Sequence, residues 1–550
     1  MMRLPLFQRA AAAGTAVAAT SPHALVRPNR GLPLMLLFPF LLLAVFVGVV
    51  GGLDSPPLVA IVGTAVLSVL MVFVLPLHGM FWCLFVLTFL LQGSAVYFLK
   101  LRPAAWLAFG LAILFFCRAL LDLVVHKREQ QRVRKGDGST VELAALLFLV
   151  AFVISMVFNR VPKSQIFSAV KAMLPMFSVL FALYWFRWKE SHLETSWRMM
   201  FWVVLLQVPV VLYQHFFVAT ATTFDAIVGT FGGTPGFGGN SAIMVLFTVV
   251  AMGYAAARWN AGQMSGKAMW AFQAIGFAII LLGEVKAAFI WLPLVLAWVL
   301  RRRILRSIGA FIGFAVLIAA FVGTTYTVYE TLYWGKKVQS AHNVAEKLDR
   351  GGGYFFDPNN VNYRTGEISR AASLALWAHD PLETVPRRLV GYGPGASKPS
   401  GLLGAGEVAK RYQPLHLDAT ALAILLWDVG LLGALAYGSM LLFSLLAAWR
   451  YTRRKQGSVA QLALADTCVA AMLLFLMMLV YNRALMDEPT AQLLLMMCMG
   501  TIVQLCRFGS STLGNCVFSG RHCYKTFVAR KRICEMRDVD FPCCAGSKCS

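Results

Sequence analysis

Apolar runs that match the length of a bilayer-spanning helix recur through most of the sequence. A helix needs about 20 predominantly apolar residues to cross the hydrocarbon core of a membrane. Runs of this length follow one another from residue 32 to residue 506, with polar segments between them. The strands of a membrane barrel would be shorter and would alternate apolar with polar residues. The pattern therefore predicts an all-α polytopic integral membrane protein.

The composition agrees with this fold class and changes the meaning of the charge. Hydrophobic residues make up 59% of the chain and charged residues 13%, and the formal net charge is +24. In a soluble protein so basic a chain would suggest a nucleic-acid partner. In a membrane protein Lys and Arg accumulate in the cytoplasmic loops. We therefore expect membrane lipids around the protein and no nucleic acid bound to it.

The polar segments predict the topology. If the apolar runs alternate in direction, the segments dense in Lys and Arg all fall on one side, which the positive-inside rule makes cytoplasmic: 126–135, 187–198, 258–267, 301–306 and 450–455. The expected spans are 32–52, 58–77, 78–99, 104–125, 141–158, 167–186, 198–219, 241–257, 269–283, 287–300, 308–325, 417–448, 460–481 and 490–506. Merging the two short runs near Lys286, or reading 58–99 differently, lowers the count. We therefore expect about 12–14 transmembrane helices, with both termini in the cytoplasm.

This topology divides the chain into five parts. They are a cytoplasmic leader (1–31), N-terminal transmembrane helices (32–325), one large outer loop domain (326–416), C-terminal transmembrane helices (417–506) and a basic, Cys-containing cytoplasmic tail (507–550). Helical pieces are expected in the loop near 338–350 and 364–379. The run at 417–448 is long enough for one tilted span, or for a half-helix followed by a span.

Cations gather on the outer side, where the positive-inside bias works against them. They are Lys286, Lys336, Lys337, Arg364, Arg370, Arg387, Arg388, Lys410, Arg411 and Arg483. Arginine holds phosphate groups with bidentate, charge-assisted hydrogen bonds, so the set favours a site for a phosphate or pyrophosphate headgroup. For any single residue the alternative is a solvated surface balanced by nearby acids. Lys286 lies with Glu284 between apolar halves, where a charge usually marks a pathway or a site; the alternative is an ion pair that caps a helix end.

A histidine lies directly at the membrane entry of a long apolar run. His416 precedes this run, and histidine titrates near ambient pH, which suits a general base for a sugar hydroxyl. Asp418 is a candidate to orient it, although residues two apart on a helix do not face each other. The alternative is a polar boundary residue. The glycine runs GTFGGTPGFGG and GYGPG can bring backbone amides close to phosphate, although such turns are common without a ligand.

The sequence predicts no metal and no other cofactor. No outer cluster of His, Cys and acidic residues has the spacing of a zinc site. The first outer loop, LDSPP, lacks the adjacent acidic pair typical of metal-dependent lipid-sugar glycosyltransferases, and no Walker-type phosphate loop occurs. The cysteines of the tail are irregularly spaced, which favours a disordered basic tail over a metal site.

The order of these features resembles the O-antigen ligase and O-antigen polymerase superfamily of bacterial envelopes. The resemblance covers about residues 220–450 and rests on four stretches: GTFGGTPGFGGNSAIM before a span, Lys286 at the start of a span, NYRTGEISRAASLALWAHDPLETVPRRLVGYGPG, and HLDATALAILLWDVGLLG. The chain departs from the family pattern at Lys286, where the family often has arginine, and at Asp428, where it usually has glutamate. His416 also lies about one helical turn further from Gly430 than the common pattern places it.

The resemblance implies metal-independent glycosyl transfer on the periplasmic face of the bacterial inner membrane. The donor would be an undecaprenyl-pyrophosphate-linked glycan, and the acceptor another glycan or the lipid A core. Lys286, Arg364 and Arg370 would hold the pyrophosphate, with Arg387, Arg388 and Asp418 also binding substrate, and His416 would be the base. A polysaccharide transporter or lipid-linked oligosaccharide flippase is the alternative, which would place charges along a midplane path and show repeat symmetry. A scaffold subunit of an envelope assembly is a third possibility.

Overall fold

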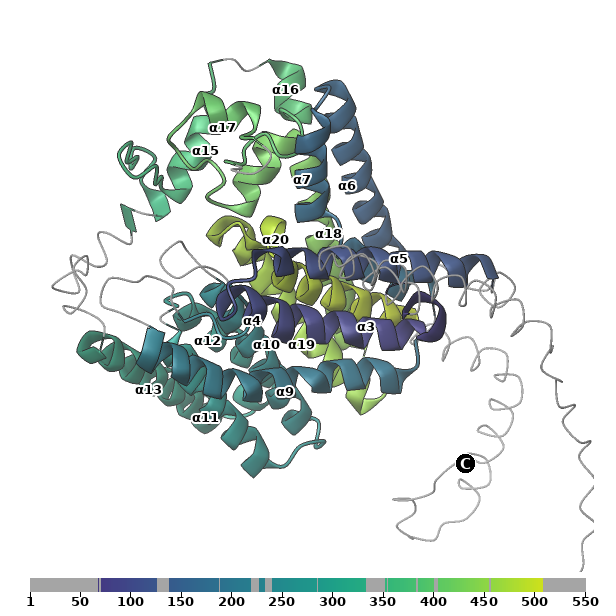
Figure 1. Ribbon diagram of the computed structural model, residues 1–550. Coiled ribbons are helices and arrows are strands. Elements are labelled where there is room, and N and C mark those ends of the chain that lie inside the picture. Colours follow the sequence, from purple (N-terminus) through teal and green to yellow (C-terminus); the bar gives the residue numbers. More distant parts are fainter. Residues whose placement is uncertain are drawn as a thin grey trace, which may run out of the picture. The chain divides into compact units, whose positions relative to one another are not determined.

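The structure is a computed structural model, and Figure 1 shows its ribbon. It describes residues 71–125, 138–186, 188–218, 227–232, 240–283, 285–332, 352–353, 355–381, 384–399, 404–454 and 457–507, together with Ser68. The expected leader (1–31), the first expected span (32–52), most of the second (58–77), the expected helical piece near 338–350 and the tail beyond Arg507 lie outside these residues. Apart from Ser68, the described part belongs to one compact unit that begins at Met71.

In the described part of that unit the regular elements are helices, and one isolated bridge joins Val361 to Ile368. The helices are α3 (Leu77–Val86), η1 (Leu87–Leu91), α4 (Gln92–Tyr97), η2 (Arg102–Trp106), α5 (Leu107–Val125), α6 (Gly138–Phe158), α7 (Lys163–Met173), α8 (Phe177–Trp185), α9 (Glu190–Tyr213), η3 (Gln214–Val218), α10 (Ser241–Asn260), α11 (Gly266–Leu282), α12 (Ala288–Ile304), α13 (Ile308–Leu332), α15 (Arg370–Ala378), α16 (Val385–Val390), α17 (Glu407–Arg411), α18 (Ala421–Arg454), α19 (Val459–Tyr481) and α20 (Ala484–Asp487). A last helix spans Pro489–Arg507.

The helical, polytopic fold class is confirmed. Nine segments of the described chain are long and apolar enough to cross a membrane: Leu77–Tyr97, Pro103–Val125, Ser139–Phe158, Glu190–Val218, Ser241–Asn260, Ile308–Val328, Ala421–Arg454, Val459–Tyr481 and Pro489–Arg507. The expected span 167–186 corresponds to the bent pair α7 and α8, which together are long and apolar enough for one broken span and whose axes differ by 58°. The two short runs near Lys286 form the separate helices α11 and α12. The expected helical piece 364–379 is helical only from Arg370 to Ala378.

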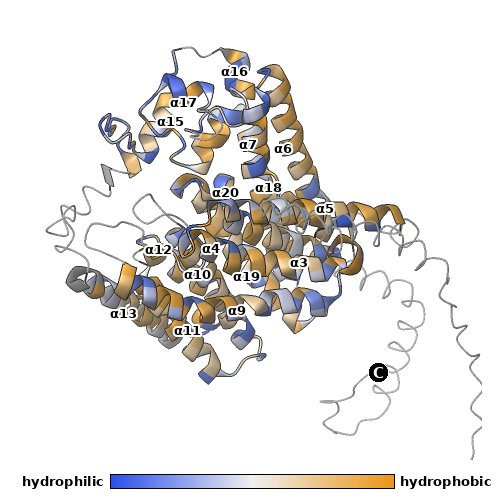
Figure 2. Cartoon of the chain, in the orientation of Figure 1, coloured by the Kyte–Doolittle hydropathy of each residue, from blue (hydrophilic) through white to orange (hydrophobic). Residues whose placement is uncertain are grey.

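The bundle has a clear centre and periphery. All residues of the most apolar stretch of α10 are buried, as are most of those in α19 and in the last helix, whereas only 6% of the corresponding residues of α13 are buried. The central helix α10 packs against α9, α11, α12 and α19. Outward-facing side chains on the peripheral helices are large and apolar, as Leu147, Ile312 and Val316 illustrate. Figure 2 shows this apolar character along α5 and α6, and it suits contact with lipid.

A short glycine-containing segment folds back into the bundle between α9 and α10. Residues 227–232 are all buried, and glutamines from α9 and η3 hydrogen-bond their backbone. Gln214 Oε1 accepts from Val228 N (2.9 Å) and Gly229 N (2.7 Å), and its Nε2 donates to Gly229 O (2.9 Å). Non-helical backbone is tolerated at membrane depth only when protein groups satisfy its hydrogen bonds. We call residues 227–232 the re-entrant segment.

The re-entrant segment reaches deep between the helices. Gln207 Oε1 accepts from Thr230 N (2.8 Å), and Gln207 Nε2 donates to Thr230 Oγ1 (2.7 Å). Gln207 lies eleven residues before the end of η3 at Val218, which corresponds to about 16 Å along a helix axis. Thr230 Oγ1 also donates to Phe89 O (2.6 Å), in the π-helical turn η1.

The re-entrant segment packs closely against Gly93, which leads to a prediction about stability. A Cβ at Gly93 would lie 2.2 Å from Thr230 O and 2.4 Å from Gly232 N, which are backbone atoms that cannot rotate away. We expect Gly93→Ala to lower the free energy of unfolding by about 1–3 kcal/mol through overpacking. Thermal unfolding in nanodiscs measures this.

Gly110→Ala on α5 is the matched control, because a Cβ there meets nothing within 4 Å. An alanine in an open helical position should stabilise the protein by up to about 1 kcal/mol. Equal melting temperatures for the two variants would show that the re-entrant segment does not pack on Gly93 as described.

The long helix α18 is broken at Gly430, which has φ +66° and ψ −167°. The run 417–448 therefore contains a half-helix followed by a span, which was one of the two expectations. The GYGPG turn (391–395) docks into the break: Tyr392 N donates to Trp427 O (2.8 Å), and Gly393 N donates to Asp428 O (3.0 Å). A Cβ at Gly391 would lie 2.6 Å from backbone atoms of Asp428 and Gly430. A Cβ at Gly430 would lie 2.4 Å from Leu389 O and 2.5 Å from Gly391 N. Glycine is needed at both positions for the two backbones to meet.

Candidate functional site

The chain enters α18 through residues 416–419, and helix α15 holds this segment in place. Ser373 Oγ donates to Leu417 O (2.8 Å), and Arg370 Nη1 donates to Ala419 O (3.1 Å). His416 N donates to Gly366 O (2.8 Å), while the imidazole is exposed. The predicted residues Arg370, His416 and Asp418 therefore meet at one short segment.

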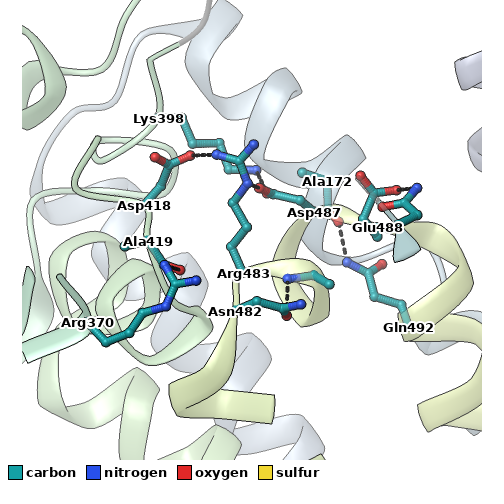
Figure 3. A network of polar contacts seen from close by, with 12 residues as sticks. Ala172, Arg370, Lys398, Asp418, Ala419, Asn482, Arg483, Asp487, Glu488 and Gln492 are labelled. Atoms are coloured by element: carbon teal, nitrogen blue, oxygen red, sulfur yellow. Dashed lines mark hydrogen bonds and ion pairs between the residues drawn. The ribbon is translucent and has the colours of Figure 1, made fainter. Parts of the chain in front are cut away.

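A cluster of charged residues lies beside this segment, at the end of the bundle where α18 begins and α19 ends. It is drawn in Figure 3 with the exception of Lys171, and we call it the rim cluster: Lys171, Lys398, Asp418, Arg483, Asp487 and Glu488. Arg483 Nη1 donates to Asp418 Oδ2 (2.5 Å), and Arg483 Nε lies 3.4 Å from Asp487 Oδ2. Lys398 Nζ pairs with Asp487 Oδ1.

The rim cluster presents an arginine to solvent while burying its partner acid. The Arg483 side chain is 49% exposed, whereas that of Asp418 is only 4% exposed. Asp418 Oδ1 is buried and makes no hydrogen bond in the structure. Burial raises the pKa of Asp418, and the charge of Arg483 opposes this rise. The arrangement holds a guanidinium half in water, where it can contact an anionic ligand.

Glu488 connects the rim cluster to the interior of the bundle. Its carboxylate accepts from Asn240 Nδ2 (3.0 Å). Burial first, and then the neighbouring charge of Asp487, raise the pKa of Glu488 to about 7; the hydrogen bond from Asn240 and the cations Arg483 and Lys398 act in the opposite direction. Glu488 therefore changes its charge near neutral pH.

A second polar cluster has a structural role. Asp380 is buried and accepts from Arg411 Nη1 (3.0 Å), from the Tyr412 hydroxyl (3.0 Å) and from the Tyr392 hydroxyl. The guanidinium of Arg411 also lies over the Tyr392 ring, 4.8 Å from its centroid. Arg411 is thus committed to an ion pair that holds α17 against the turn that follows α15.

The other cations predicted as substrate-binding residues do not gather at the segment 416–419, and Lys336 and Lys337 lie outside the described residues. Arg387 lies over the Tyr392 ring at 4.9 Å, and Arg388 Nη2 donates to Ala378 O (3.1 Å). Arg364 is exposed in a turn closed by Asn362. Lys286 is exposed in the turn that precedes α12.

The amides of Tyr392, Gly393 and Gly395 in the GYGPG turn donate to groups of the protein itself, two to backbone carbonyls and one to a side chain. Asp428 is fully buried, and its carboxylate accepts from Gly395 N (2.7 Å) and Ser397 N (2.8 Å). Asn159 Nδ2 donates to Gly391 O (3.1 Å). The interpretation of this turn as a phosphate-binding loop is therefore replaced by a structural one. Over the part of the chain with described placement, no group of three or more His, Cys, Asp and Glu is arranged to hold a metal ion.

Most residues of the rim cluster carry no signal in the sequence that marks them as a site. Lys171 falls inside an expected span, and Lys398 follows a glycine turn like any loop residue. The available signal was the pair Asp487 and Glu488, two adjacent acids between two expected spans. The sequence indicates Arg483 only as one of the outer cations, not as a site residue.

Comparison with known proteins adds no relative. No protein-family model matches the chain, and no curated protein sequence matches it.

Proposed function

We propose that the protein transfers a glycan from a lipid-linked pyrophosphate donor to an acceptor hydroxyl, without a metal, at the outer face of a bacterial inner membrane. One observation carries the proposal: Arg370, Arg483 and His416 converge on residues 416–419, at the end of an apolar helical bundle. This combination supplies cations for a phosphorylated lipid and a titratable base at the surface where lipid-linked substrates lie.

The chemistry needs two functions from the protein. The acceptor oxygen attacks the anomeric carbon, the bond from that carbon to the pyrophosphate oxygen breaks, and the electron pair leaves with the pyrophosphate. The imidazole of His416 takes the proton of the acceptor hydroxyl. Arg370 and Arg483 stabilise the charge that develops on the leaving pyrophosphate.

The other predicted cations have a supporting role in this proposal. Lys286, Arg364, Arg387 and Arg388 would bind the donor away from the reacting atoms, and Asp418 would hold Arg483 rather than contact the substrate. The acceptor is either another lipid-linked glycan, as in a polymerase, or the lipid A core, as in a ligase.

One observation favours a second candidate, a transporter or flippase for lipid-linked oligosaccharides. The re-entrant segment places irregular backbone inside the bundle, and such backbone commonly lines the substrate path of transporters. The transfer reaction remains the first proposal because the cations and the histidine lie at the end of the bundle rather than along its interior.

The test uses the full chain in nanodiscs with EDTA and a fluorescent oligosaccharide linked to undecaprenyl pyrophosphate. We expect release of undecaprenyl pyrophosphate together with elongated or transferred glycan. Arg483→Ala should lower kcat/KM about 100-fold, because an electrostatic contact to the leaving group is lost. Arg453→Ala, at the opposite end of α18 and stacked on Trp449, is the matched control and should leave the rate unchanged.

Two results would overturn the proposal. One is the absence of transfer to any glycan or lipid A core acceptor by protein that is folded. The other is movement of the intact donor across the bilayer of proteoliposomes without bond cleavage, which would support the flippase.

A further inference from the structure

Asn240 joins the re-entrant segment to the rim cluster. It is buried at the N-terminal end of α10, and its Nδ2 donates both to Phe231 O (2.8 Å) and to Glu488 Oε2 (3.0 Å). Figure 3 shows Glu488 next to Asp487 in the rim cluster. One amide group therefore fixes a carboxylate of the charged cluster relative to the backbone that enters the bundle.

Rare helical turns contact the re-entrant segment. Both π-helical turns of the described chain, η1 and η3, contact it: Phe89 O accepts from Thr230 Oγ1, and Gln214 binds residues 228 and 229. π-Helical turns are rare and occur frequently at functional sites. A helical hairpin that only crosses the membrane needs neither these turns nor a buried loop.

Charged groups from three segments surround Glu488, and α10 contributes the neutral amide of Asn240. Asp487 precedes it at the end of α20, and Arg483 precedes that helix. Lys398, in the loop after the GYGPG turn, and Lys171, on α7, act on it through their charge. Gln492 Nε2, one turn further along the last helix, donates to Ala172 O (2.6 Å), which fixes α7 at this position.

We propose that the re-entrant segment positions the rim cluster through Asn240, and that the protonation state of Glu488 sets how strongly the cluster binds an anionic phosphoryl group. The identity of that ligand rests on the proposed function; the coupling between Asn240 and Glu488 does not.

The charges of the rim cluster determine whether phosphoryl binding strengthens or weakens as the pH rises. With Glu488 ionised, the cluster holds three cations and three anions. When Glu488 is neutral, three cations face two anions, and a phosphoryl group meets less repulsion. Phosphoryl binding should therefore be stronger below pH 7 than above it. Loss of the hydrogen bond from Asn240, which favours the ionised carboxylate, should move this transition to higher pH.

The first experiment measures binding of farnesyl pyrophosphate to the full chain in nanodiscs from pH 5.5 to pH 8.5. Because the probe itself titrates, each affinity is divided by that of Glu488→Gln, which keeps an acceptor for Asn240 but carries no charge. We expect a ratio near one at the acidic end, falling about tenfold at the alkaline end. In Asn240→Ala the midpoint should shift upward. Asn260→Ala, at the other end of α10, should match the wild type.

The second experiment measures the protonation of Glu488 in the absence of any ligand. Infrared titration of the protonated carboxyl stretch, with the Glu488→Gln spectrum subtracted, should give a midpoint near pH 7 that rises in Asn240→Ala. An unchanged midpoint in folded Asn240→Ala, or the same pH step with and without Glu488, would overturn the inference. If the wild type binds no pyrophosphate at any pH while the infrared midpoint shifts as expected, the proposed function fails and the coupling stands.

Discussion

Replacing His416 with alanine is expected to lower the rate of glycan transfer by about 10²–10⁴-fold, because a positioned general base contributes that much. Binding of the lipid-linked donor should change little, because the imidazole of His416 is exposed and the residue is anchored through its backbone amide, which donates to Gly366 O. Single-turnover transfer and donor binding, measured separately in nanodiscs, give the two quantities.

His379 provides the matched control for this prediction. It is an exposed histidine at the other end of α15, where Nδ1 lies 2.9 Å from Ala375 O. His379→Ala should transfer glycan at the wild-type rate. Equal rates for His416→Ala and the wild type would remove the assignment of the base, and a fall in donor binding equal to the fall in rate would assign His416 to substrate binding instead.

Replacing Asp428 with alanine is expected to lower the free energy of unfolding by about 2–6 kcal/mol. The change leaves the buried amides of Gly395 and Ser397 without an acceptor, and each such loss costs about 1–3 kcal/mol. Thermal unfolding in nanodiscs measures the loss. Limited proteolysis should also cut within 391–399 in the variant, because the turn no longer docks on the broken helix.

Asp122→Ala tests whether any lost carboxylate has this effect. Asp122 pairs with Arg118 at 3.2 Å near a helix end, and such partly exposed pairs contribute about 1 kcal/mol or less. A melting temperature for Asp428→Ala close to that of Asp122→Ala, with the turn still resistant to protease, would contradict the structural role of Asp428.

The spans were predictable because hydropathy is a local property. The expected run 308–325 coincides with most of α13, and 460–481 with α19, since twenty neighbouring residues suffice to identify each. The break between α7 and α8 had one local signal, Pro175. Proline alone does not decide such a break, because Pro209 and Pro293 lie inside α9 and α12, which continue through them.

The candidate site was predictable only where its residues are neighbours in sequence. His416 and Asp418 stood out because they directly precede an apolar run. Lys171, Lys398 and Glu488 come from segments more than 80 residues apart, and one sequence does not say which loops meet. Arg411 is one of the outer cations that favour a phosphate site in the sequence, yet it is committed to an ion pair with Asp380. Asp380 lies 31 residues earlier, and nothing in the sequence indicates that it is buried.

The docking of the GYGPG turn into α18 has a consequence for the order in which the protein takes shape during synthesis. The turn is held on one side by Asn159, which is synthesised early, and on the other by Asp428, which is synthesised after residues 326–416. Residues 326–416 are thus fully translated before Asp428 can anchor the turn. The rim cluster is complete only after Glu488 has also been synthesised. A chain interrupted after residue 416 but before Asp428 contains residues 326–416 and most of the candidate spans of the described chain, yet it has no assembled site.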